Sequence, residues 1–201
     1  MSPLYCCLVA VLCLPRASAS PVAAASISVS AVQTPVEPTP VQFLRVHNEA
    51  RAAFLRAHNE ARAAVGVPPL AWNATIALDA QRYAGELRAS CEARPVWAWG
   101  TDGVYGRNLY RGSGPRVRAG ADASARWAEG ARWYDRDGDS CAAPPGRCCG
   151  EYTQMVWRAT TQIGCARRLC RCLGDTCPLE LDTVAVCEYY PPGNIAGQRP
   201  Y

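Results

Sequence analysis

The sequence contains no lysine and only two histidines, although it carries 21 basic residues, all of them arginine. The arginines are scattered and the net charge is only +4, so the chain lacks the basic stripe that is typical of nucleic-acid-binding proteins. Bidentate recognition of phosphate or carboxylate is one interpretation of an arginine-only composition. Because alanine is also abundant, we favour a compositional bias and expect no nucleic-acid partner.

Long apolar runs are scarce as well, and the most apolar one lies at the N-terminus. Residues 4–14 suit the core of a signal peptide and are too short to cross a bilayer as a helix. Ala17-Ser18-Ala19 has the small-x-small pattern of a cleavage site, so we predict a signal peptide over residues 1–19. No later segment is apolar enough to span a membrane. These features predict a secreted, soluble protein that is not a transmembrane protein.

Cysteine is plentiful. Three of the twelve cysteines lie within the predicted signal peptide and nine remain after it. In an oxidising compartment this density is typical of a disulfide framework. Cys170, Cys172 and Cys177 could be drawn as a zinc site, but their spacing is not that of a zinc finger, so we interpret them as disulfide partners.

A Pro/Ala/Ser-rich linker is predicted over residues 20–41, followed by a single domain over residues 42–201. The domain begins with a tandem duplication, because residues 43–53 and 54–64 differ only at Val46 and Ala57. Eleven residues make about three helical turns, so an extra copy lengthens a helix with little change of register. We predict one continuous helix in which only the second copy packs on the domain.

Further helices are predicted from Asn73, as an N-cap, to about residue 90 and over residues 119–134, with strands over residues 162–170 and 183–189. Helices around a small antiparallel sheet give an α+β fold. Asn73 also begins a glycosylation sequon. The acidic stretch at residues 135–139 lacks the later glycine and glutamate of a calcium-binding loop, which indicates a solvated turn.

Seven motifs, in the right order from about residue 54 to the end of the chain, resemble the plant class-one pathogenesis-related proteins of the CAP superfamily, whose conserved unit is the SCP domain. The motifs are His58-Asn-x-Ala-Arg62, Val65-Gly-Val-Pro-Pro-Leu-Ala-Trp72, Tyr105-Gly-x-Asn-Leu109, Tyr152-Thr-Gln-x-Val-Trp-Arg158, Gly164-Cys-Ala166, Tyr190-Pro-Pro-Gly-Asn194 and Gln198-Arg-Pro-Tyr201. This resemblance implies a disulfide-stapled three-layer α-β-α sandwich, secretion to the apoplast and a role in defence.

The resemblance also implies a cleft in which two histidines and two glutamates can hold a divalent metal. All four positions are replaced in this chain, by Gly100, Arg107, Gly130 and Glu151. We therefore expect no metal and no cofactor, and we expect Arg107 to pair with Glu151 if the fold brings them together. The only histidines, His47 and His58, match the structural His-Asn pair of the family, so we interpret them as packing or capping residues.

The disulfide pairing that the resemblance implies consists of three bonds, Cys91–Cys170, Cys141–Cys149 and Cys165–Cys187. Cys172 and Cys177 flank a Gly-Asp turn and should form an extra local bond. This assignment leaves Cys148 without a partner, which would suit an intermolecular contact.

Three functions are compatible with the resemblance. The first is binding of a sterol or other lipid in an apolar groove, for which Trp133, Tyr134 and Tyr152 are the candidate residues, although core packing is the alternative role for them. The second is a precursor of an eleven-residue C-terminal signalling peptide, Pro191–Tyr201, with its own receptor; Tyr190 replaces the aspartate of the family's junction. A hydrolase ranks last, because no Ser-His or Cys-His pairing can be drawn in the cleft. We therefore expect a defence protein that is not an enzyme.

Overall fold

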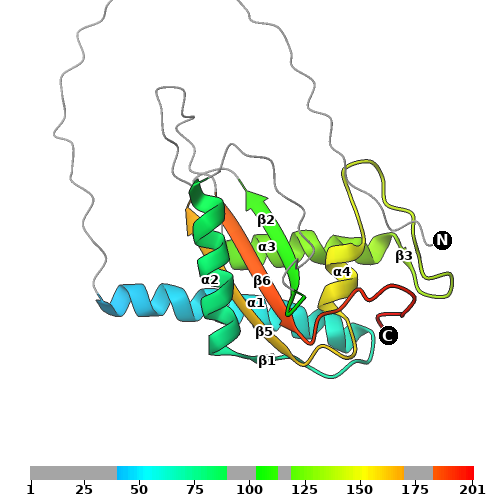
Figure 1. The fold of residues 1–201 in the computed structure, drawn as a ribbon, viewed down its shortest axis with the longest axis horizontal. Coiled ribbons are helices and arrows are strands. Elements are labelled where there is room, and N and C mark those ends of the chain that lie inside the picture. Colours follow the sequence, from blue (N-terminus) through cyan, green and yellow to red (C-terminus); the bar gives the residue numbers. More distant parts are fainter. Residues whose placement is uncertain (1–39, 90–102, 113–118, 170–182) are drawn as a thin grey trace, which may run out of the picture.

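The computed structural model describes residues 40–89, 103–112, 119–169 and 183–201 (Figure 1). Its main sheet has the strand order β1-β5-β6-β2, made of β1 (Ala71–Trp72), β5 (Gln162–Leu169), β6 (Thr183–Tyr190) and β2 (Gly106–Gly112). Helix α2 (Ala74–Ala89) covers one face, and Figure 1 shows α1 (Pro40–Ala64) and α3 (Ala119–Ala128) behind the strands. The structure is therefore the expected α+β fold with the sheet between two helical layers.

Both faces of the central strand are covered. Every residue of β6 from Thr183 to Tyr189 is buried, as is typical of a strand between two layers. Ala185, Cys187 and Tyr189 belong to the core cluster on the side of α1 and α3, whereas Val186 packs with α2. β2, β6 and β5 pair antiparallel, as expected, but the two-residue β1 pairs parallel to β5. The small sheet is thus mixed at its outer edge.

The tandem repeat forms one continuous helix, as predicted, although it begins at Pro40, two residues before the expected domain boundary. Proline is tolerated in the first turn of a helix because the amides there have no helical partner. The second copy buries Phe54, His58 and Arg62, spaced four residues apart on one face. In the first copy most described side chains are exposed, but Ala50 and Ala53 are half-buried beside Gly120 of α3.

Helix α2 begins as the sequence predicts. The Oδ1 atom of Asn73 accepts hydrogen bonds from the N–H groups of Thr75 (2.8 Å) and Ile76 (3.2 Å), which is N-cap geometry. A Cβ atom at Gly164 of β5 would lie 2.1 Å from the backbone nitrogen of Ala77, so glycine lets this helix approach the sheet closely. The Asn73 Nδ2 group donates to Gln162 (2.6 Å), and glycosylation of Asn73 stays a prediction.

The third predicted helix is shorter than expected. α3 ends at Ala128 and continues as a 3₁₀ turn, η1 (Glu129–Arg132), before the hairpin of β3 (Tyr134–Asp135) and β4 (Ser140–Cys141). Gly130 explains the change, because glycine is a poor α-helix former and here packs tightly against α4 (Gly150–Met155). In the hairpin, the Asp135 carboxylate accepts hydrogen bonds from the N–H groups of Asp137 and Gly138, which makes a local turn.

The described residues contain two disulfides, and both match the expected pairing. Cys141–Cys149 ties the β3–β4 hairpin to the start of α4, and Cys165–Cys187 joins directly opposed residues of β5 and β6. Cys148 takes part in neither bond. Several predictions lie outside the described residues: the signal peptide at residues 1–19, most of the linker, and the bonds that involve Cys91, Cys170, Cys172 and Cys177. In the described part of the chain, no helix has both the length and the apolarity to cross a membrane.

Candidate functional site

Three of the four positions of the expected metal cleft lie in the described residues: Arg107 on β2, Gly130 in η1 and Glu151 in α4. Gly100 lies outside them. The structure corrects the expected pairing of Arg107 with Glu151, because Arg107 bonds to Glu188 on the neighbouring strand β6. Its Nη2 and Nε atoms donate to Glu188 Oε1 at 2.6 and 2.9 Å. The two side chains are only 5% and 1% exposed, so this is a buried ion pair.

Strand alternation explains the choice of partner. Arg107 and Glu188 stand opposite each other in the β2–β6 register, and the Arg107 guanidinium lies over the ring of Tyr83 in α2, 3.8 Å from its centroid. The next residue, Asn108, points to the other face of the sheet and donates to the backbone oxygen of Glu151 (2.9 Å). Arg107 and Glu151 therefore belong to opposite faces of the sheet.

Gly130 is buried, and there is no room for a larger side chain beside it. A Cβ atom there would lie 2.7 Å from the Cβ of Tyr152 and 3.2 Å from the backbone oxygen of Cys148. The preceding residue, Glu129, is half-exposed and pairs with Arg147 at 2.7 Å. A glutamate therefore does not fit at position 130 unless Tyr152 and α4 move.

Glu151 is the one acidic side chain left at a described position of the cleft. The Sγ atom of Cys148 donates to its Oε2 atom at 2.9 Å. Within the described ranges, no group of three or more His, Cys, Asp or Glu side chains is arranged to hold a metal ion. With Arg107 turned to the opposite face of the sheet and a packed glycine at position 130, Glu151 has no second ligand at the described positions of the cleft, so the residues present there do not fit a divalent metal.

His58 is the central polar residue of the core. Its Nδ1 atom lies 2.8 Å from the backbone oxygen of Phe54, so Nδ1 carries the proton, and Nε2 accepts from the Tyr189 hydroxyl at 2.7 Å. Asn108 Nδ2 donates to the same hydroxyl (3.0 Å). Burial lowers the pKa of His58 to about 4 and raises the pKa of Tyr189 well above its usual value. His58 is thus a neutral packing residue, as expected.

Arg62 is a structural residue whose role the sequence did not reveal. It is 1% exposed, and its guanidinium donates to the backbone oxygens of Pro68, Met155, Trp157 and Thr160. Burial, followed by the charge of Arg158, lowers its pKa to about 10, so it remains protonated at neutral pH. Its position four residues after His58, on the same helix face, was the available signal. Arg62 joins α1 to the turn that follows α4.

Two of the three candidate lipid-binding residues, Tyr134 and Tyr152, lie side by side in the structure. Tyr134 and Tyr152 form a cluster with Tyr201, in which the ring of Tyr134 lies 6.2 Å from each of the other two rings. The hydroxyls of Tyr152 and Tyr201 lie 3.3 Å apart, and Tyr134 donates to Asp139 (2.8 Å). Burial raises the pKa of both Tyr134 and Tyr152 above the usual value. Trp133 is half-buried on the same segment. We call Tyr134, Tyr152 and Tyr201 the tyrosine cluster.

The C-terminal segment, Pro191–Tyr201, lies against α4 and the turn after it. The N–H of Gly193 donates to Gln154 Oε1 (2.9 Å), and Asn194 Nδ2 donates to the backbone oxygen of Gly150 (2.8 Å). The oxygen of Pro200 accepts from the N–H of Arg158 (2.7 Å). The segment is thus fastened at both ends, whereas Tyr190 just before it is 45% exposed.

Comparison with known proteins is consistent with this arrangement. The CAP family, described as the cysteine-rich secretory protein family, matches residues 55–189. The pathogenesis-related protein PRMS of Zea mays is 40% identical over 165 residues, which cover 82% of this chain and 84% of the relative. Pathogenesis-related protein 1B of Nicotiana tabacum is 43% identical over 159 residues, 79% of each chain.

Solved structures share the fold at lower identity. Na-ASP-1 superposes with a TM-score of 0.56 at 23% identity, over 76% of this chain and 41% of that one, so this chain spans less than half of its length. The crystal structure of NaASP2 with Zn²⁺ has a TM-score of 0.54 at 22% identity, over 76% of this chain and 85% of that one. These two likenesses concern the fold alone. On the family match and the plant relatives, the chain belongs to the cysteine-rich secretory protein (CAP) family and is a defence-related relative of the plant class-one pathogenesis-related proteins.

Proposed function

We propose that this chain is a secreted, apoplastic defence protein that acts by binding a sterol or other lipid and not by catalysis. The buried Arg107–Glu188 pair carries the proposal, because an arginine that forms an ion pair now stands at a position where the family's metal ligand would stand. The fold is kept while the metal chemistry is lost. The family description and the plant relatives support secretion and defence.

The histidines also favour a non-enzymatic role. Both ring nitrogens of His58 are hydrogen-bonded, and its pKa of about 4 leaves little basicity near neutral pH. His47 lies on the exposed first copy of the repeat. Among the described residues of the cleft, neither histidine forms a hydrogen bond to a serine or cysteine in the contacts given above.

Zinc titration tests the loss of metal chemistry. We expect no micromolar binding when the secreted, demetallated protein is titrated with zinc in a calorimeter, since Glu151 is the one potential ligand left at the described positions of the cleft. The Glu151→Ala variant serves as the control. Micromolar binding in the wild type that this substitution abolishes would refute the proposal.

The tyrosine cluster and the half-buried Trp133 support a lipid site on this side of the molecule, because they combine apolar rings with polar hydroxyls. We expect saturable binding of radiolabelled sitosterol to the secreted protein. Trp133→Ala should weaken it about tenfold by removing aromatic contact area. Leu169→Ala, which removes an exposed apolar side chain on β5, is the matched control and should bind normally. Absence of saturable binding, or equal binding by Trp133→Ala, would contradict the proposed site.

A second candidate is release of the C-terminal segment as a signalling peptide with its own receptor. The exposure of Tyr190 favours it, because this side chain is open to recognition by a protease. Mass spectrometry of extracellular fluid should then detect Pro191–Tyr201 as a free peptide. Tyr190→Asp restores the family's junction residue and should increase the yield of peptide. If no peptide is released from either form, this alternative fails.

A further inference from the structure

The outer edge of β5 is open along most of its length. β1 pairs only with Gln162 and Ile163, so within the described residues no strand flanks β5 from Gly164 to Leu169. An edge of this kind carries a row of backbone N–H and C=O groups, which can pair with a further strand. The edge that β1 leaves open is long enough for a short extended peptide.

The pairing of β5 with β6 shows which backbone groups face this edge. Cys165 and its disulfide partner stand opposite each other with their Cα atoms 4.1 Å apart, a distance typical of antiparallel pairs that are not hydrogen-bonded to each other. Two residues earlier, the oxygen of Ile163 accepts from the N–H of Asn73 at the end of β1. By alternation, the N–H and C=O groups of Cys165, Arg167 and Leu169 also face away from β6. The described residues supply no backbone partner for these groups.

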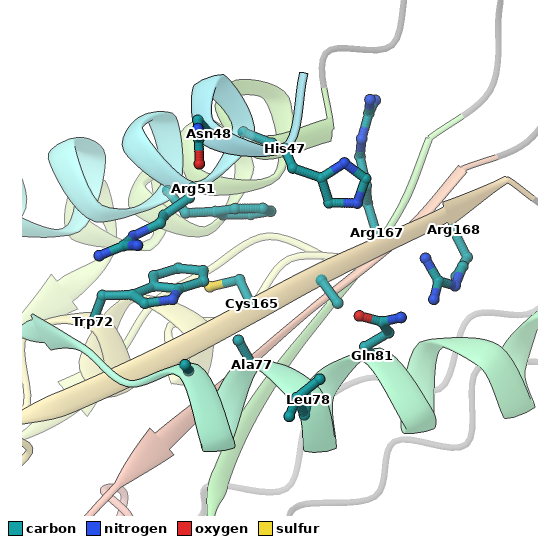
Figure 2. Close-up of a pocket in the computed structure, with 14 residues that line it drawn as sticks. His47, Asn48, Arg51, Trp72, Ala77, Leu78, Gln81, Cys165, Arg167 and Arg168 are labelled. Atoms are coloured by element: carbon teal, nitrogen blue, oxygen red, sulfur yellow. The ribbon is translucent and has the colours of Figure 1, made fainter. Parts of the chain in front are cut away.

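A groove of about 310 Å³ lies beside this edge, between α1 and α2 (Figure 2). Phe54, Trp72 and Leu78 give it an apolar lining. The first copy of the repeat lengthens α1 on one side of the groove and contributes Ala50 and Arg51. A strand added to β5 would lie about 4.8 Å from it and would direct its side chains alternately toward the two helices. The groove thus borders the edge where a peptide backbone would lie.

Positive charge borders the groove on both faces of the sheet. Cys165 belongs to the core cluster on the side of α1 and Ala166 packs with α2, so alternation sends Arg167 to the α1 side and Arg168 to the α2 side. Figure 2 shows the two side chains extending in different directions from β5. Arg51 adds a third guanidinium. No carboxylate lines the groove, and in the part of the chain that the structure describes none of these three arginines forms an ion pair.

We propose that the open edge of β5 binds an extended acidic peptide segment of a partner protein by strand addition. Consecutive side chains of an extended peptide point to opposite faces, as those of Arg167 and Arg168 do, so two consecutive acidic residues would each meet one guanidinium. The peptide backbone would pair with the N–H and C=O groups that face the edge. This site goes beyond the proposed function, because it uses neither the tyrosine cluster nor Trp133.

The same arginines disfavour a second copy of this chain as the occupant. Pairing of two β5 edges would bring Arg167 and Arg168 of both copies close together, and like charges on paired strands are destabilising. Charged side chains on an edge strand protect it against such self-pairing. An acidic segment meets no repulsion of this kind, so the charges select it over a second copy. If the arginines were only protective, no peptide would bind.

Fluorescence polarisation with a labelled peptide tests the proposal on the full-length secreted protein. The probe is fluorescein-Val-Thr-Val-Glu-Asp-Val-Thr-amide, whose β-branched residues favour an extended backbone. We expect saturable binding that Arg167→Gln/Arg168→Gln weakens about tenfold or more. The matched control, Arg56→Gln/Arg132→Gln, removes the same charge from two exposed positions outside the groove and should bind as the wild type does. A probe with Gln-Asn in place of Glu-Asp should bind at least about tenfold more weakly.

A second comparison separates strand addition from simple charge attraction and leaves the protein unchanged. Two further probes keep both carboxylates and carry N-methyl groups on alternate amides, one set along each edge of the peptide. Only the edge that faces β5 needs its N–H groups, so one methylated probe should bind at least about tenfold more weakly than the other. Absence of saturable binding, wild-type binding by the Arg167/Arg168 variant, equal loss in its control, equal affinity for the uncharged probe, or equal affinity for the two methylated probes would each overturn the proposal.

Discussion

Arg62 carries a buried positive charge that backbone oxygens solvate, and this makes it sensitive to replacement. Arg62→Met replaces the guanidinium by an apolar side chain of similar length and removes the donor to the oxygens of Pro68, Met155 and Thr160, whereas the Trp157 oxygen keeps the N–H of Thr160. We expect the free energy of unfolding to fall by about 3 kcal/mol or more, since each buried unpaired group is costly. Urea denaturation followed by circular dichroism measures it. Arg56→Met, exposed on the same helix, should change stability by less than about 0.5 kcal/mol. A loss at Arg62 no larger than this control would contradict the assigned role.

His58 should make stability depend on pH. Its pKa is about 4 in the folded protein and near 6.5 when unfolded, so the unfolded chain binds more protons between these values. The stability that the neutral His58 contributes to the free energy of unfolding is fully present above pH 6.5. It is lost as the pH falls toward 4, by at most about 3 kcal/mol. In His58→Gln, which can keep both hydrogen bonds, this part of the slope should disappear. Denaturation at several pH values compares the two proteins, and identical slopes would rule out His58 as the cause.

At the scale of elements, the first copy of the repeat is an extension of α1 with a small share in the core. Deleting residues 43–53 removes the half-buried Ala50 and Ala53 but leaves Phe54, His58 and Arg62 in place. We expect the free energy of unfolding to fall by no more than about 2 kcal/mol. Thermal melting of the deleted and full-length proteins measures the effect. A loss of several kcal/mol would show that this copy is part of the core.

How much of the fold the sequence predicts depends on the length and pattern of each element. The repeat helix and the strands at residues 162–169 and 183–190 have long, regular patterns, and Asn73 marks the start of α2, so these were predictable. β1 and α4 are too short to give a periodic signal. β2 was missed because it lies in a glycine-containing stretch and its pairing depends on β6, 77 residues away at Leu109–Val186.

For the candidate site, the sequence predicted the positions of the residues but not their contacts. The resemblance located the replaced positions Arg107, Gly130 and Glu151, because motifs fix positions along the chain. It did not reveal that Glu188 is the partner of Arg107, since that pairing follows from the register of a strand that the sequence did not predict. Arg62 and Tyr201 were missed for a similar reason, because their contacts with Thr160 and Tyr152 are distant in sequence.

At the scale of the whole molecule, the layers are connected by polar contacts as well as by the apolar core. His58 of α1 contacts Tyr189 of β6, and Asn108 of β2 links that hydroxyl to the backbone of α4. The C-terminal segment then covers α4 from outside through Gly193 and Asn194. α4 is therefore held between the sheet network and the last residues of the chain. The stability of α4 should therefore depend on the contacts with the sheet and on the contacts with the C-terminal segment.

Truncation after Tyr190 tests this dependence. It removes the partners of Gln154, Gly150 and Arg158, together with the buried Pro200 and the ring contact of Tyr201 with Tyr134. At about 1 kcal/mol for each hydrogen bond, offset in part by the ordering entropy of the segment, we expect the free energy of unfolding to fall by about 2–4 kcal/mol. Urea denaturation of the truncated and full-length proteins measures the difference.

Ile195→Ala is the control for the truncation, because Ile195 is 44% exposed within the same segment and its loss should have little effect. If the truncated protein is as stable as the full-length one, the segment does not contribute to the stability of the domain. Its release as a peptide would then leave the domain unaffected. If stability falls as expected, peptide release would also weaken the domain that remains. In that case the proteolytic step would couple a signal to the loss of the binding protein, and the amount of intact domain in extracellular fluid should decline as free peptide accumulates.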